Sequence, residues 1–331
     1  MRVYNAKTGD VLWTSNYNRE GNNNDSAADV VVKKGKVFVC GKTRAPSAGG
    51  WDWTVRAYRL KDGTLLWEDH YNREGTQADG ANALALQGRR LFVVGKSSTT
   101  ATGDTFTVRS YKAKTGALIW QNLFDADSTD SLDDEAFDVV ALGKRLFVVG
   151  QSETNASEYG FTVRAYRPRN GNLLWTKEMN QEPDTSGVDI ALAVAVSKGL
   201  VFVAGESETT AGGVAFTVRA FSARRGTLIW EDRYDPEGSE GDSARALVVK
   251  GKKLYVVGET SSALKGDAFT VRAYNARTGA VLWTNRYDRE NADQRDQAVA
   301  VAIKGRRLFV AGITRTAATN TDFSIRAYST R

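Results

Sequence analysis

Six aspartates recur along the chain, each two residues before an alanine, and their carboxylates are the groups best suited to binding a cation. They are Asp25, Asp79, Asp134, Asp189, Asp242 and Asp296. Carboxylate oxygens suit calcium or magnesium. If the six came together in a ring, their like charges would favour a bound cation or partial protonation. The alternative is that each aspartate accepts hydrogen bonds from loop backbone, as aspartates commonly do at turns.

Residues that could carry catalysis are otherwise sparse. His70 is the single histidine and Cys40 the single cysteine. Cys40 falls where other repeats carry valine or alanine, which favours a small core residue. No phosphate-binding glycine loop, nucleophile elbow or zinc-ligand spacing is present in the sequence. The sequence therefore predicts a protein that is not an enzyme, with no catalytic residue and no cofactor other than Ca²⁺ at the aspartates.

The aspartates belong to a repeat that runs through the whole chain. Its most recognisable residue is a tryptophan that recurs every 53 to 55 residues, at Trp13, Trp67, Trp120, Trp175, Trp230 and Trp283. A period of this size is typical of repeat arrays and propellers. Each repeat divides into four short segments of strand character joined by glycine turns, and no segment has the 3.6-residue period of a helix. The sequence predicts an all-β protein.

Six repeats of four strands predict a six-bladed β-propeller of four-stranded antiparallel blades. Residues 1–4 match residues 325–328 at an offset of six periods of 54. We therefore expect residues 1–331 to form one domain closed by strands from both termini, with the last blade shared between residues 1–17 and 295–331. One copy of the third strand is surplus. No apolar run is long enough to predict a membrane span, and no leader is recognisable at the start of the sequence.

The segment from Ala273 to Trp283, with Asn275, Thr278-Gly279 and the tryptophan in fixed spacing, resembles the tryptophan-docking motif of the pyrroloquinoline-quinone (PQQ) propeller superfamily. The resemblance covers the chain blade by blade, and it implies that each tryptophan packs between neighbouring blades. The quinoprotein enzymes of that superfamily have eight blades, and no residues match their cofactor ligands or a cysteine pair. The closer likeness is to non-enzymatic PQQ-like repeat proteins, which favours an extracytoplasmic or secreted location, although the sequence itself leaves the compartment unknown.

Other recurring residues admit two interpretations. Five of the six tryptophans are followed by an aromatic residue four positions later. This pattern suits core packing better than a ligand platform. Every third strand carries an arginine that could bind anions or could pair and pack within the structure. Trp51 lies outside the repeat position, in one of the least repetitive loops, so it is a candidate exposed contact; it could equally cover its own loop.

The net charge of +6 comes from 45 Lys and Arg against 39 Asp and Glu, and its distribution is uneven. Bases gather in the turns that join strands one to two and three to four, which share one face of a propeller. The one-to-two turns carry Lys33, Lys34, Arg89, Arg90, Lys144, Arg145, Lys252, Lys253, Arg306 and Arg307. Acids gather in the loops between blades, for example Glu20, Glu74, Glu237 and Asp293. The sequence predicts one strongly basic and one strongly acidic face.

Three functions fit this pattern. The first is a non-enzymatic scaffold for protein–protein interaction or head-to-tail self-assembly, because complementary faces can stack without closing. The second is a module whose basic face docks on an anionic surface, either polysaccharide, lipid or nucleic acid; nucleic acid is disfavoured because the turns lack interleaved aromatic residues. The third is a quinoprotein-type enzyme. Copying one charged repeat six times would also polarise the surface without any partner.

Overall fold

The computed structural model describes residues 1–19, 24–44, 50–75, 77–126, 133–155, 158–180, 188–209, 213–236, 238, 241–261, 266–288, 294–315 and 321–330. These residues form 26 strands in seven sheets and no helix. The predicted all-β class is therefore confirmed. Contacts divide the chain into two compact units, the first comprising 1–148 with 166–172 and the second 149–165 with 173–331.

Five sheets contain the four consecutive antiparallel strands predicted for a blade. The first is β3 (Asp25–Lys33), β4 (Lys36–Arg44), β5 (Trp51–Arg59) and β6 (Leu65–Tyr71). The second is β7 (Gly80–Gln87), β8 (Arg90–Thr99), β9 (Gly103–Lys112) and β10 (Leu118–Phe124). The third is β11 (Glu135–Leu142), β12 (Arg145–Asn155), β13 (Glu158–Tyr166) and β14 (Leu173–Met179).

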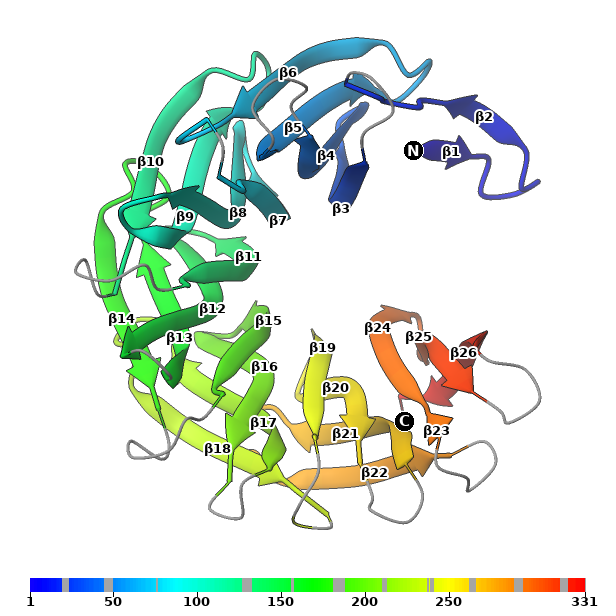
Figure 1. The fold of residues 1–331 in the computed structure, drawn as a ribbon. Coiled ribbons are helices and arrows are strands. Elements are labelled where there is room, and N and C mark those ends of the chain that lie inside the picture. The colour runs from blue at the N-terminus through cyan, green and yellow to red at the C-terminus, as the bar shows by residue number, and fades with distance from the viewer. Residues whose placement is uncertain are drawn as a thin grey trace. The chain divides into compact units, whose positions relative to one another are not determined.

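The third sheet has residues in both units, and the remaining two complete blades belong to the second unit. One is β15 (Ile190–Ser197), β16 (Leu200–Glu208), β17 (Val214–Ser222) and β18 (Leu228–Tyr234). The other is β19 (Ser243–Lys250), β20 (Lys253–Thr260), β21 (Gly266–Asn275) and β22 (Val281–Tyr287), with β23 (Gln294–Arg295) pairing in parallel with β21. Within this unit the first strands β15, β19 and β24 follow one another in contact (Figure 1).

The two terminal sheets are incomplete. The N-terminal sheet is β1 (Arg2–Tyr4) with β2 (Val11–Thr14), and the C-terminal sheet is β24 (Gln297–Lys304), β25 (Arg307–Arg315) and β26 (Thr321–Ser329). Their strands correspond to the predicted third and fourth strands at the start of the chain and first to third strands at its end. The two sheets are separate in the strand pairing, so six blades and closure of the ring stay predictions.

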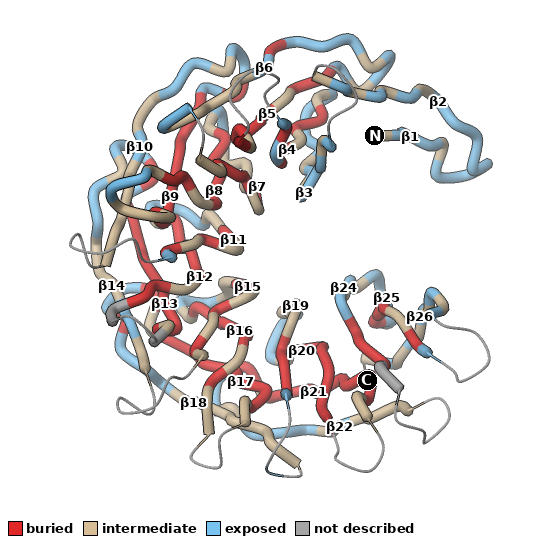
Figure 2. The backbone as a smooth tube through the Cα atoms, in the orientation of Figure 1, coloured by how far each residue is buried: buried red, intermediate tan, exposed pale blue. Residues whose placement is uncertain are grey.

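The core of each unit lies along the second and third strands of its sheets (Figure 2). Their apolar residues, such as Phe92 and Val108 in the first unit and Tyr255 and Val271 in the second, are almost fully buried. First strands contain a β-bulge, for example between Ala244 and Ala246, opposite a glycine of the second strand. A Cβ at Gly258 would come 1.8 Å from the Ser243 carbonyl oxygen. Glycine is required here because the strands approach too closely for any side chain.

Candidate functional site

The recurring tryptophans bridge neighbouring sheets within each unit. The Trp230 indole N–H donates to the carbonyl of Ala276 at 3.2 Å, and its ring stacks on Tyr274 with centroids 5.9 Å apart. A Cβ at Gly279 would lie 2.7 Å from the same indole, and Gly279 has a positive φ of 76°. The turn glycine is therefore needed twice, for its backbone conformation and for the close approach of the tryptophan. Equivalent indole hydrogen bonds join Trp13 to Leu60, Trp67 to Ala113, Trp120 to Pro168 and Trp175 to Ala223.

Trp283, the sixth copy, packs between two tyrosines of the second unit. Its ring centroid lies 6.1 Å from that of Tyr255 and 5.9 Å from that of Tyr328. In all six copies the indole thus meets the adjoining sheet with its face or its N–H. This use of the ring leaves no recurring aromatic platform open to a ligand.

Four third-strand arginines, Arg56, Arg109, Arg272 and Arg326, stack on the aromatic residue that lies four positions after a tryptophan. The Arg272 guanidinium lies 3.6 Å from the Tyr234 ring centroid, and Arg109 lies 3.7 Å from that of Tyr71. Arg272 also donates to the Tyr274 hydroxyl at 2.8 Å and to Asp232 at 3.2 Å. Stacking and ion pairing of this kind hold the sheets together. The sequence did not connect the arginine with the aromatic residue, because the two lie in different repeats.

The six aspartates sit at separate blade junctions. Asp79 shows the pattern: its backbone N–H donates to the Trp51 carbonyl, and its carboxylate accepts from the N–H groups of Arg73 at 2.9 Å and Ser98 at 3.1 Å. Asp25 makes the matching pair of bonds with Arg19 and Arg44, so both aspartates tie the loop after the preceding sheet to the end of their own second strand. This is the loop-backbone role that the sequence left open beside the cation role.

The sequence did not predict that backbone bridges also join the sheets at these junctions. The residue next to the aspartate pairs in parallel with the third strand of the preceding sheet, as in the bridges Asp104 to Asp133, Tyr159 to Val188 and Val214 to Gly241. Among the described residues no group of three or more His, Cys, Asp or Glu is arranged to hold a metal ion. Calcium at the aspartates stays a prediction without a described site.

Burial changes the acidity of two of these aspartates. It raises the pKa of Asp79 to about 6 and that of Asp242 to about 7, from an ordinary value of 3.8. Asp242 has one oxygen bonded to the Ser261 N–H at 2.6 Å, whereas its buried Oδ2 has no hydrogen-bond partner. Asp25 and Asp79 each accept a hydrogen bond from the backbone N–H of the residue six positions earlier. The residue six positions before Asp242 is Pro236. Proline has no N–H to donate.

The other candidate residues are accounted for by packing. Cys40 is buried, which raises the pKa of its thiol. His70 lies between the hydroxyls of Thr54, 3.1 Å from Nδ1, and Tyr17, 3.3 Å from Nε2, and burial lowers its pKa. Trp51 begins β5 rather than lying in a loop and is half-buried, with the Lys42 ammonium 4.8 Å from its ring centroid. Its role as a contact stays a prediction.

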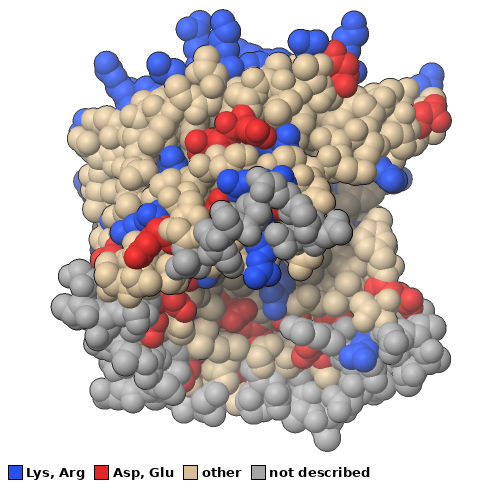
Figure 3. Space-filling model, turned by 45° about the horizontal axis from the view of Figure 1, so that its top comes forward, with Lys and Arg blue, Asp and Glu red and all other residues tan. Residues whose placement is uncertain are grey.

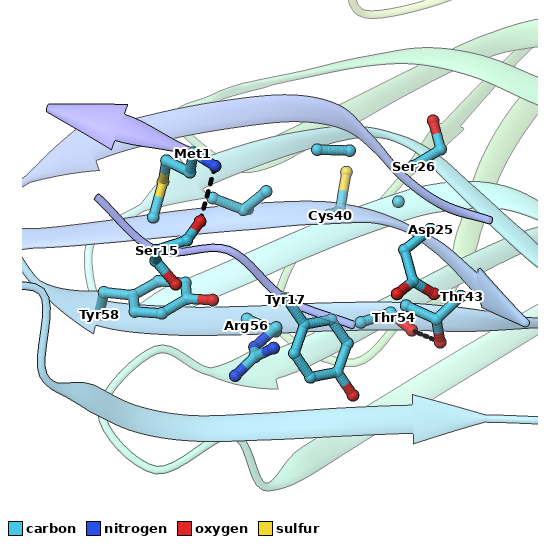
Figure 4. Close-up of a pocket in the computed structure, with 13 residues that line it drawn as sticks. Met1, Ser15, Tyr17, Asp25, Ser26, Cys40, Thr43, Thr54, Arg56 and Tyr58 are labelled. Carbon is cyan, nitrogen blue, oxygen red and sulfur yellow. Dashed lines mark hydrogen bonds between the residues drawn. The ribbon is translucent and has the colours of Figure 1, made fainter. Parts of the chain in front are cut away.

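A small cavity of about 230 Å³ lies beside the N-terminal sheet in the first unit. Figure 4 shows the Met1 amino group donating to the Ser15 carbonyl at one end of it, and the Arg56 guanidinium beside the Tyr17 ring. Arg56 stacks on Tyr17 at 3.5 Å, as Arg109 stacks on Tyr71 and Arg272 on Tyr234. The cavity is lined by residues of the N-terminal hairpin and of the first complete blade.

The basic turns meet in pairs at one end of each sheet. Backbone N–H groups of the three-to-four turn donate to carbonyls of the one-to-two turn, for example Ala276 to Lys252 and Ala113 to Arg89 at 2.8 and 2.9 Å. The same bond recurs from Leu60 to Gly35, Ala223 to Gly199 and Thr330 to Arg306. Because of these bonds, the bases of both turns project from the same end of their sheet. Of the acids predicted for the other face, Glu20, Glu237 and Asp293 lie outside the described residues.

These features define the class of the protein, an all-β repeat protein built from propeller-type blades. A model of the PQQ-type repeat family, described as outer membrane protein assembly factor BamB, matches residues 51–268, which is 218 of the 331 residues. The chain belongs to this family, as its docking motif predicted. No curated protein matches the chain in a sequence comparison. Within the described residues there is no helix of the length and apolarity needed to cross a membrane.

Solved structures with the same fold include BamB, an alcohol dehydrogenase and the propeller domain of a protease. BamB from Moraxella catarrhalis is 13% identical with a TM-score of 0.51, covering 97% of this chain and 88% of that one. Quinohemoprotein alcohol dehydrogenase from Comamonas testosteroni is 10% identical with a TM-score of 0.61, covering 99% of this chain and 63% of that one. This chain therefore spans less than two thirds of the enzyme's length. The propeller domain of the Trilobed protease from Pyrococcus furiosus is 9% identical with a TM-score of 0.51, covering 92% of this chain and 82% of that one.

The third-strand arginines do not form a site for the quinone cofactor of the quinoproteins. Arg272, Arg109 and Arg56 are stacked on tyrosines at separate blade junctions, so their charges are not brought together around one tricarboxylate. The low identity to the dehydrogenase shows a shared fold only.

Proposed function

We propose that the protein is a non-enzymatic scaffold that binds a protein partner, or a second copy of itself, through its basic sheet ends. The observation that carries this proposal is the pairing of basic turns at one end of five sheets by backbone hydrogen bonds. In Figure 3, lysine and arginine side chains gather along one edge of the face shown. Clustered charge of one sign attracts a surface of the opposite sign over distances longer than a contact.

The recurring residues support a scaffold rather than a reaction centre. The tryptophans, arginines and aspartates hold blades together, so the part of the repeat left free to act is the charged turns. The family description, an assembly factor of the outer membrane, favours protein interaction and a location outside the cytoplasm. Acidic inter-blade loops would supply the opposite face for head-to-tail stacking.

Salt-dependent association tests this function. Light scattering and negative-stain imaging across about 20 mM to 1 M salt span the range in which Debye screening shortens from tens of ångströms to a few. We expect assemblies or partner complexes at low salt that dissociate at high salt. A variant with Lys33, Lys34, Lys252 and Arg306, all exposed, changed to glutamate should not assemble. A monomer at every salt concentration that instead binds anionic vesicles would replace this function with docking on an anionic surface.

The scaffold we propose is a six-bladed ring whose last blade combines residues 1–17 with 295–331. The match between residues 1–4 and 325–328, and the incomplete sheets at both ends, support this closure. Spin labels at Thr14→Cys and Ser329→Cys in a Cys40→Ala background would measure it. One short, narrow distance distribution is expected from a shared blade. A broad distribution at long distance would show an open ring.

A further inference from the structure

We propose that a groove between the sheets β15–β18 and β19–β22 is a docking site for a segment of a protein partner in which one apolar side chain is flanked by acidic residues. The inference rests on the proposed scaffold function and names the chemistry of the partner. The groove lies within the second unit, at the end of these sheets where the basic turns pair. It encloses about 650 Å³.

The groove has an apolar floor and a basic rim. Phe202 and Leu200 line it from β16, and Ile229 lines it from β18 with half of its surface exposed. Lys198, Lys252 and Arg277 line it from three different turns, and no acid is among the lining residues. An exposed isoleucine over a buried phenylalanine favours an apolar side chain, whereas three cations around it favour carboxylates on either side. A sugar–phosphate backbone or a polysaccharide would leave the floor without a partner.

Leu200 makes this blade different from the others. The residue that begins the second strand is basic in the other five repeats: Lys36, Arg90, Arg145, Lys253 and Arg307. In the next blade, Lys253 reaches across the junction and donates to the Thr330 carbonyl at 2.9 Å. A long side chain at this position therefore spans the gap between sheets. Leucine is too short to span it, which leaves the groove open.

The turn beside Leu200 holds a lysine in an unfavourable backbone conformation. Lys198 has a φ of 49°, and among the described residues only Lys34 shares a positive φ without being glycine. The left-handed region costs such a residue on the order of 1 kcal/mol relative to glycine. Four other one-to-two turns place glycine first, at Gly88, Gly143, Gly251 and Gly305. Strain of this kind often marks residues retained for binding, and Lys198 lies on the groove.

A selection of peptides tests the proposal without assuming a sequence. A displayed library of random 12-residue peptides is selected on the full chain and counter-selected on the Leu200→Arg variant, which restores the repeat. We expect enriched peptides to carry one aliphatic or aromatic residue flanked by Asp or Glu. Basic peptides, or peptides that bind Leu200→Arg equally, would overturn the proposal. Anionic vesicles that compete away the peptides and bind with Ile229-dependent affinity would assign the groove to lipid instead.

Matched variants separate docking from stability. Lys198→Gly and Lys34→Gly relieve the same backbone strain, so both should raise the melting temperature. Only Lys198→Gly should weaken binding of the selected peptide, by roughly fivefold, which corresponds to one charged contact. Ile229→Ser should weaken it, whereas Leu282→Ser, the equivalent exposed position one blade later, should not. Equal effects within either pair would contradict the groove.

Failure of this inference can be told apart from failure of the scaffold function. If salt-dependent association persists in Leu200→Arg and no acidic–apolar peptide is selected, the scaffold survives and the groove is wrong. If peptides dock but no assembly or partner complex forms at any salt concentration, the groove stands and the basic ends do not act collectively. Loss of both in the wild-type chain would overturn both proposals.

Discussion

Two blade junctions in the second unit contain the same arginine in different surroundings. At the junction closed by Trp230, Arg272 stacks on Tyr234 and bonds Asp232, and the Tyr274 hydroxyl also donates to Asp232 at 2.9 Å. At the preceding junction, the positions equivalent to Tyr234, Asp232 and Tyr274 are occupied by Met179, Lys177 and Phe221. Arg219 has instead the Phe161 ring at 4.3 Å and one bond from Nε to Glu231 at 3.2 Å.

The consequence is a buried charge with incomplete hydrogen bonding. Arg219 is fully buried, and its Nη1 and Nη2 atoms have no hydrogen-bond partner. Burial lowers the pKa of its guanidinium, although the nearby carboxylates of Glu231 and Asp189 oppose that change. Burying a charge without full compensation costs free energy. A residue that recurs in a repeat can thus keep its position after the contacts that stabilise it have been replaced.

The largest expected difference comes from removing each arginine. Arg272→Met leaves Asp232 without its cation and removes the stack on Tyr234, so it should lower the free energy of unfolding by roughly 3–5 kcal/mol. Arg219→Met removes an incompletely satisfied charge and should be neutral or stabilising. Urea unfolding of both variants at pH 7 measures the difference. Equal losses in the free energy of unfolding would contradict this prediction, because they would mean that the Arg219 charge is as well compensated as that of Arg272.

The aspartates allow the same comparison for an acid. Asp79 has a donor on each oxygen, whereas Asp242 has lost one donor to Pro236. The pKa of Asp242 is raised in the folded state, to about 7, so the folded protein binds more protons than the unfolded chain between about pH 4 and 7. Its contribution to stability is therefore present below pH 4 and is lost as the pH rises through 7.

Asp242→Asn removes this titration. Since a pKa difference of this size corresponds to roughly 2–4 kcal/mol, the variant should exceed the wild type in stability by up to that amount at pH 8 and match it near pH 4. Asp79→Asn is the matched control, because its pKa is raised less and its second acceptor oxygen is in use. Unfolding by urea at pH 4, 6 and 8 measures both. A wild type and a variant with parallel pH profiles would contradict the assignment to Asp242.

Much of the blade could be predicted because its signals are local. The tryptophan period, the turn glycines and the short apolar runs predicted five complete four-stranded sheets, and the structure contains them. The Arg272–Tyr234 stack could not be predicted, because its partners lie in different repeats and meet only after the sheets pack. The orphaned oxygen of Asp242 was also hidden, although proline at position 236 is a signal that a residue-by-residue comparison of repeats would have found.

The smallest expected effect comes from rebuilding the irregular junction. Met179→Tyr would place a ring where Tyr234 stacks on Arg272, and a cation–π contact at a partly buried site contributes about 1 kcal/mol. Adding Lys177→Asp and Phe221→Tyr would restore the bonds seen around Arg272. We expect the triple variant to gain more than the sum of its single changes, because each new group satisfies the same guanidinium. A double-mutant cycle with Arg219→Met measures this coupling, which should vanish once the arginine is gone. Additive gains that persist without Arg219 would mean that the new residues stabilise the junction by packing alone.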